Sequence, residues 1–177
     1  MAWNALATSI EGRRDDLLAA LRRLAPFRPG GYRNVVVAEV DDPAALLPRV
    51  RDALAADARL AGALAKLVPL ALHVRFEAPT ASATFAAAAE PLLDRLAGKS
   101  FFVRLERRGM KGRLHTPTVE REVGDAVWRA LEARGHAPRV AFRDPDVVLV
   151  IETLGDQAGI GVLDRATRTA FPFVKVR

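Results

Sequence analysis

Hydrophobic and polar residues alternate along the chain with two different periods, one typical of helices and one typical of strands. Apolar residues recur at helical spacing in four segments, residues 11–24, 43–54, 84–96 and 116–134. Short β-branched or alternating segments predict strands at residues 3–8, 34–40, 70–76, 100–107, 140–142, 147–151 and 159–163. Because helices and strands are interspersed, the pattern predicts an α+β fold.

The second half of the chain has the clearer pattern. Residues 100–107 alternate strictly, which places Phe101, Val103 and Leu105 on one face of a strand. Thr116 is expected to cap the next helix, with a proline at its first position and a glycine after its end. Residues 147–151 have no polar face, so we expect this strand to lie in the middle of a sheet.

The best internal boundary is the segment Pro79-Thr80-Ala81-Ser82, which is small, polar and proline-containing. The sequence therefore predicts two small domains, residues 1–80 and residues 81–177.

Composition excludes several classes of protein. Half of the 177 residues are hydrophobic, so the chain can bury a core, and it has no cysteine for disulfides, thiolate metal sites or thiol nucleophiles. No apolar run is long enough to span a membrane, and no basic and then apolar segment marks an export signal at the N-terminus. We therefore expect a cytoplasmic protein with no membrane partner.

Positive charge is concentrated in one segment. The chain has a net charge of +6, and seven basic side chains but only two acidic ones lie between Lys99 and Arg121. Such clustering favours an anionic partner, and a phosphate backbone is the simplest one. A general bias towards arginine explains the number of arginines, but it explains their clustering less well.

Motifs for catalysis are weak. The tripeptide Gly98-Lys99-Ser100 lacks the first glycine of a phosphate-binding loop, because that position holds Leu93. Asp144 and Asp146 flank a proline, which favours a turn before a buried strand over an acid–base pair. We therefore predict no catalytic residue and no cofactor.

Metal binding has little support either. The three histidines, His73, His115 and His136, lie far apart and have no neighbour at helical ligand spacing. No metal site is predicted.

The basic segment itself is the best candidate for binding. A strand brings Arg104 and Arg107 towards its end, Gly109 and Gly112 allow the backbone to approach a phosphate, and the helix that follows presents free N–H groups. Arg104 is the exception to watch, because its strand position allows it to pair with an acid, Glu106 or Glu152. The alternative is an exposed turn with spare charge. The candidate RNA-binding residues are Lys99, Arg104, Arg107, Arg108, Lys111, Arg113, His115 and Arg121.

Three segments together resemble the THUMP domain, the RNA-binding module of thiouridine synthases, certain RNA methyltransferases and tRNA acetylation adaptors. They are the strand and turn of residues 100–109, the helix that contains Glu120 and Gly124, and residues 144–153. The first half is similar to the ferredoxin-like domain that commonly precedes THUMP. The resemblance thus implies a ferredoxin-like domain at residues 1–80 and a THUMP domain with a central sheet at residues 81–177.

The resemblance also implies a function. In this family the two domains hold the acceptor end of tRNA, and a catalytic domain is usually fused to them. Since the sequence ends at Arg177, the closest parallel is the adaptor that presents tRNA to a separate modification enzyme such as a cytidine acetyltransferase. We expect such a protein to be no enzyme itself. Two alternatives remain open: a protein–protein scaffold with a basic face, and a small enzyme that uses the C-terminal carboxylates.

Overall fold

The computed structural model describes residues 1–176, which form two compact units. Unit 1 comprises residues 1–71 and 167–175, and unit 2 comprises residues 72–166 together with residue 176. Each unit contains its own β-sheet and its own helices, so the predicted α+β fold class is confirmed.

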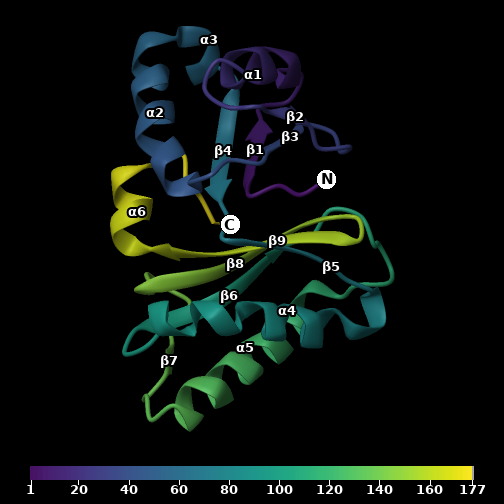
Figure 1. Cartoon of the computed structure of the whole chain (residues 1–177), viewed down its shortest axis with the longest axis vertical. Helices are drawn as coiled ribbons and strands as arrows, with labels where there is room; N and C mark the ends of the chain where they lie inside the picture. Colours follow the sequence, from purple (N-terminus) through teal and green to yellow (C-terminus); the bar gives the residue numbers. More distant parts are fainter. Residues whose placement is uncertain (177) are drawn as a thin grey trace. The chain divides into compact units, whose positions relative to one another are not determined.

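Unit 1 is built on a four-stranded antiparallel sheet in the order β2-β3-β1-β4. Its strands are β1 (Ala5–Ser9), β2 (Arg28–Pro29), β3 (Val35–Ala38) and β4 (Leu64–Pro69). Its helices are α1 (Arg14–Leu21), α2 (Pro43–Ala56) and α3 (Ala58–Ala61). Figure 1 shows these elements in purple and blue.

Local sequence explains most of unit 1. Asp42 caps α2, because its side chain accepts the backbone N–H groups of Ala44 and Ala45, and Pro43 begins the helix. Two strands were not predicted, because β2 has only two residues and β4 lies in a stretch rich in alanine and leucine. Apart from α3, the order of elements follows the β–α–β–β–α–β pattern of ferredoxin-like folds, whereas the assignment of residues 1–80 as such a domain stays a prediction.

Unit 2 is built on a five-stranded mixed sheet in the order β5-β9-β8-β6-β7. Its strands are β5 (Leu72–Arg75), β6 (Ser100–Glu106), β7 (Arg139–Val140), β8 (Val147–Leu154) and β9 (Gln157–Asp164). Strand β6 runs parallel to β7 and β8, whereas β9 is antiparallel to both β8 and β5. As predicted, the apolar strand β8 is the central one, and all of its residues are buried.

The helices of unit 2 are α4 (Ala81–Ala89), α5 (Thr116–Ala133) and two 3₁₀ segments, η1 (Ala78–Thr80) and η2 (Glu90–Arg95). Helix α6 (Arg165–Ala170) begins in unit 2 and ends in unit 1. Helices α4 and α5 lie on the same side of the second sheet (Figure 1). The core between them includes Phe85 of α4, Val123 of α5 and Phe101 of β6, all fully buried.

Two boundaries differ from the prediction. The helix expected at residues 84–96 is α-helical only to Ala89, because Pro91 lacks an N–H group and the chain continues as a 3₁₀ helix. The two units divide between Ala71 and Leu72, nine residues before the boundary expected after residue 80, because β5 pairs with β9. Among the described residues, no helix combines the length and the hydrophobicity that a membrane span requires.

Candidate functional site

The basic loop, residues 107–115, connects the end of β6 to the start of α5. Its two glycines and one other residue have positive φ angles, with Gly109 at 85°, Met110 at 53° and Gly112 at 74°. Glycine adopts this conformation without steric cost, so the loop turns tightly. The side chain of Leu114 is buried in the core and fixes the far end of the loop.

Arg108 anchors the loop to the neighbouring strand. Its backbone N–H donates to the Thr153 hydroxyl at 3.0 Å, and its carbonyl accepts the N–H of Gly155 at 2.9 Å. Its guanidinium lies 2.5 Å from the fully buried carboxylate of Glu152 and 3.9 Å from that of Glu106. Arg108 was predicted as an RNA contact, but the structure places its charge against these two carboxylates.

Arg104 is also paired, although with a different acid from those expected. Its Nη1 lies 3.4 Å from Oε1 of Glu120 on α5, rather than beside Glu106 or Glu152. The same carboxylate oxygen accepts the backbone N–H of Leu105 at 2.8 Å. The expected pairing of Arg104 with Glu106 or Glu152 is therefore wrong. Glu120 on α5 instead accepts the backbone N–H of Leu105 and pairs with the side chain of Arg104.

The start of α5 is capped by histidine. The Nδ1 atom of His115 accepts the backbone N–H of Thr118 at 3.4 Å and lies 2.7 Å from the Thr118 hydroxyl. Thr116, the predicted cap, instead lies in the first turn of the helix. The His115 side chain is exposed, and it fixes the end of the loop at the positive end of the helix dipole.

The remaining cations of the segment are available to a partner. Lys111, Arg113 and Arg121 are exposed, and none of them forms an ion pair with another residue in the range 1–176. Arg107 donates to the carbonyl of Gly109 within the loop. An open pocket of about 420 Å³ lies here, lined by Arg107, Gly112, Arg113, Leu114, His115, Thr116 and Pro117.

Lys99 lies away from this pocket. Lys99 precedes β6, whereas the basic loop follows this strand. The seven residues of β6 separate the two by about 23 Å. The structure thus gathers Arg107, Lys111, Arg113 and His115 in one loop and leaves Lys99 at the other end of the strand.

The part of the chain that carries this loop matches a known family. Residues 82–163 match the family model described as the THUMP domain, a range that includes β6, the basic loop, α5, β8 and nearly all of β9. Residues 82–163 are a THUMP domain. The match confirms the resemblance seen in the sequence.

Solved structures share the fold of the chain. TrmN from Thermus thermophilus has a TM-score of 0.63 at 24% identity, and the match covers 91% of this chain and 45% of TrmN. PH1313 from Pyrococcus horikoshii Ot3 has a TM-score of 0.64 at 12% identity, and the match covers 92% of this chain and 54% of PH1313. A 4-thiouridine synthetase in complex with RNA and ATP has a TM-score of 0.60 at 14% identity, and the match covers 92% of this chain and 41% of the synthetase.

Identities this low show the fold alone. The chain spans about half the length of each of these three proteins. No curated protein matches it.

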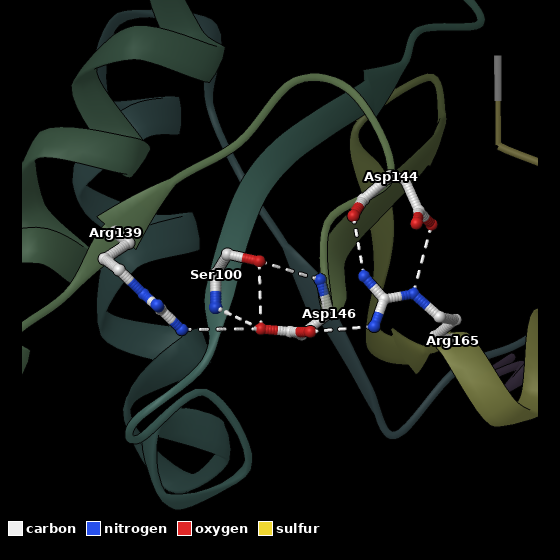
Figure 2. A network of polar contacts seen from close by, with 5 residues as sticks. All are labelled: Ser100, Arg139, Asp144, Asp146 and Arg165. Atoms are coloured by element: carbon white, nitrogen blue, oxygen red, sulfur yellow. Dashed lines mark hydrogen bonds and ion pairs between the residues drawn. The ribbon is translucent and has the colours of Figure 1, made fainter.

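The opposite end of β6 in the THUMP domain carries a closed network of polar contacts (Figure 2). One oxygen of Asp146 accepts the backbone N–H of Ser100 at 2.8 Å and its hydroxyl at 2.9 Å. The other oxygen lies 2.9 Å from Nη1 of Arg165, whose Nε lies 3.1 Å from Asp144. Arg139 approaches Asp146 at 3.8 Å. These contacts join the starts of β6, β8 and α6.

Electrostatics indicate that this network is structural. The backbone N–H and then the hydroxyl of Ser100 lower the pKa of Asp146 below its ordinary value of 3.8, and Arg165 adds to the effect against partial desolvation. A carboxyl group that is ionised so readily cannot hold a proton for general acid catalysis near neutral pH. The predicted turn before β8 therefore fits Asp144 and Asp146 better than the alternative of an acid–base pair.

Metal ligands do not gather in the described part of the chain. No group of three or more histidine, aspartate or glutamate side chains within residues 1–176 is placed to hold a metal ion.

One feature of the THUMP domain was not predicted from the sequence, an aromatic groove beside α5. Phe102, Trp128 and Phe142 line an open pocket of about 300 Å³ together with Val103, Pro117, Gly124 and Val140. Phe102 lies on the outer face of the alternating strand, which is the one indication that the sequence offers. Trp128 and Phe142 come from segments that only the fold brings to it.

Proposed function

We propose that this protein binds RNA in tRNA modification and presents the acceptor end of tRNA to a separate enzyme, such as a cytidine acetyltransferase. The observation that carries the proposal is the THUMP domain whose basic loop leaves Lys111 and Arg113 exposed and unpaired within the described residues. Two cations without internal partners at one loop suit the phosphates of a nucleic acid.

The backbone of the loop supports the same function. The positive φ angles of Gly109 and Gly112 expose backbone at the tip of the loop, where a phosphate can approach closely. Helix α5 begins directly after it, and the first turn of a helix offers free N–H groups and a positive dipole end. A protein with a related fold, a 4-thiouridine synthetase, has a crystal structure with bound RNA.

The adaptor role rests on the lack of catalytic machinery in the sequence. The chain has no cysteine and no phosphate-binding loop, and its paired aspartates are held by Ser100 and Arg165. We therefore expect no new nucleoside by mass spectrometry when tRNA is incubated with the protein and acetyl-CoA, ATP or S-adenosylmethionine. Catalytic turnover with any of these would replace the adaptor role by an enzymatic one.

The binding site is tested by removing its two unpaired cations. The variant Lys111→Gln/Arg113→Gln should bind tRNA about 25-fold more weakly in 0.1 M salt, since each phosphate contact to single-stranded RNA contributes about 0.7 to the slope of log affinity against log salt. The slope itself should flatten by about 1.4. Filter binding or anisotropy at several salt concentrations measures both quantities.

A matched control removes the same charge from the other unit. Arg23 and Arg59 are exposed and form no ion pair with any residue that the structure describes. The variant Arg23→Gln/Arg59→Gln should therefore lose little affinity. Equal losses in the two double variants would show that net charge alone acts, and the assignment of the basic loop would be wrong.

A further inference from the structure

The aromatic groove exposes apolar rings at the edge of the second sheet. Phe142 is 80% exposed and Val140 45% exposed, and they are two of the four large hydrophobic residues exposed in the described chain. The Phe102 and Phe142 rings lie with their centroids 6.2 Å apart and their planes at 39°, so they are neighbours without stacking closely. Exposed rings that gather in one hollow mark a binding surface more often than scattered ones do.

Charges of both signs border the groove, because Glu120, which pairs with Arg104, and the exposed Asp125 line it together with Arg121. The Arg104 guanidinium lies 5.3 Å from the centre of the Phe102 ring. Arg121 lines the pocket, and Arg143 follows Phe142 directly in the chain. Both are exposed, and neither forms an ion pair within residues 1–176. A ligand whose flat apolar part packs on the rings can therefore turn an attached phosphate towards Arg121 or Arg143 and away from the two carboxylates.

The groove also adjoins the basic loop. Pro117, at the first turn of α5, lines both the groove and the pocket of the loop. A strand of RNA whose phosphates contact Lys111 and Arg113 can therefore place a base in the groove without leaving the surface of α5.

We propose that the aromatic groove binds one unpaired nucleobase of the RNA, an inference that rests on the proposed function. The base packs against Phe102, Trp128 and Phe142, and its flanking phosphate faces Arg121. Single-stranded RNA is commonly bound by stacking of unpaired bases on aromatic side chains. The unpaired cations and the adjoining basic loop favour a base over an apolar side chain of a protein partner.

Trp128 provides a direct measurement, because the protein has only two tryptophans and Trp3 is 2% exposed. In a Trp3→Phe background, we would titrate the protein with a ten-nucleotide single-stranded RNA and with an abasic oligomer of the same backbone and length. The base-bearing oligomer should quench Trp128 and bind more tightly, whereas the abasic oligomer should leave the fluorescence unchanged. If Trp3→Phe does not fold, the wild type and Trp128→Phe give the same comparison.

Phe142→Ala tests the groove without disturbing the core, since this side chain is mostly exposed. Stacking of one base is worth about 1–3 kcal/mol, so the variant should bind the base-bearing oligomer about 5- to 150-fold more weakly and the abasic oligomer equally well. Ile10→Ala is the matched control, because Ile10 is an exposed hydrophobic residue (48%) of unit 1.

The outcomes separate this inference from the proposed function. Equal binding of the two oligomers with unchanged Trp128 fluorescence would overturn the groove as a base site and leave RNA binding by the basic loop intact. That result is also the one expected if the groove serves a protein partner. Failure to bind tRNA as well as both oligomers would overturn the proposed function together with the inference.

Discussion

The two ends of strand β6 carry similar side chains and use them differently. At its start, Asp146 and Asp144 match the arginine of α6, and the Ser100 hydroxyl joins the same network (Figure 2). At its end, the basic loop holds more cations than the nearby acids can neutralise, so Lys111 and Arg113 stay unpaired among the described residues. The paired charges at the start of β6 hold the strands together, whereas the unpaired cations at its end can bind an anionic partner.

The supply of carboxylates explains the difference. Near the end of β6, Glu106 and Glu152 face Arg108, and Glu120 faces Arg104. These pairs fix the base of the loop, and the cations at its tip have no acid left to bind. The excess positive charge of this segment is therefore left at the tip of the basic loop, because the neighbouring Arg104 and Arg108 are paired with acids.

The largest expected effect follows from breaking the pair at the base of the loop. Glu152 is fully buried and the Arg108 side chain is only 17% exposed, so Arg108→Met leaves a buried carboxylate without its guanidinium. Such a loss typically costs about 3–5 kcal/mol of folding free energy. Urea denaturation of the variant and the wild type measures the difference.

The double variant Arg108→Met/Glu152→Met provides the control. Because it removes both charges together, it should recover much of the lost stability, as replacement of a buried ion pair by apolar side chains often does. Unchanged stability in Arg108→Met would show that the arginine does not anchor the loop. Arg108 would then return to the set of candidate RNA contacts.

The next largest effect concerns the RNA rather than the protein. If the protein presents the acceptor end as proposed, it should prefer tRNA with an intact single-stranded 3′ end. Removing the tail should weaken binding about 5- to 150-fold, the range for loss of one stacked base. Competition between intact and trimmed tRNA in anisotropy assays measures the ratio, and a ratio of one would contradict acceptor-end recognition.

Much of the fold could be predicted from the sequence because its patterns are local. The strict alternation of β6, the apolar run of β8 and the helical stripe of α5 each specify an element by themselves, and all three are confirmed. Strand β4 was missed because its two leucines and one alanine suit a helix as well as a strand, and only pairing with β1 decides between them.

The candidate site could be predicted only in part. The sequence located the basic loop, but it could not separate Arg108 from Lys111, because the partner of Arg108 lies 44 residues away on β8. Likewise, the pair between Arg104 and Glu120 depends on how α5 crosses the sheet. The aromatic groove was missed for the same reason, since β6, α5 and the loop before β8 each supply one of its rings.

A smaller effect is expected at the closed end of β6, in the form of pH dependence. The Ser100 N–H and hydroxyl lower the pKa of Asp146 below 3.8, so the carboxylate contributes stability that is present above this value and is lost as the pH falls through the lowered pKa. Asp146→Asn should therefore reduce thermal stability at pH 7. The difference from the wild type should begin to shrink as the pH falls below 3.8, and it should be smallest below the lowered pKa, where the folded wild type is protonated as well.

Melting temperatures between pH 2.5 and pH 7 test this directly. The conservative variant Asp144→Asn is the control, because Asp144 is exposed and contacts Arg165 but not Ser100. It should show a smaller pH-dependent difference from the wild type. A constant difference between Asp146→Asn and the wild type over this range would show that ionisation of Asp146 does not stabilise the network.

The smallest expected effect decides how far the RNA site extends. Lys99 is exposed and forms no ion pair within residues 1–176, as is also true of Lys111, but it lies at the closed end of β6. The length of the strand, about 23 Å, exceeds the screening length of about 10 Å in 0.1 M salt. Lys99→Gln should therefore weaken tRNA binding less than about twofold, whereas Lys111→Gln should weaken it about fivefold through loss of one phosphate contact. Equal losses would mean that RNA follows the whole length of β6, and the contrast between its two ends would hold for folding but not for binding.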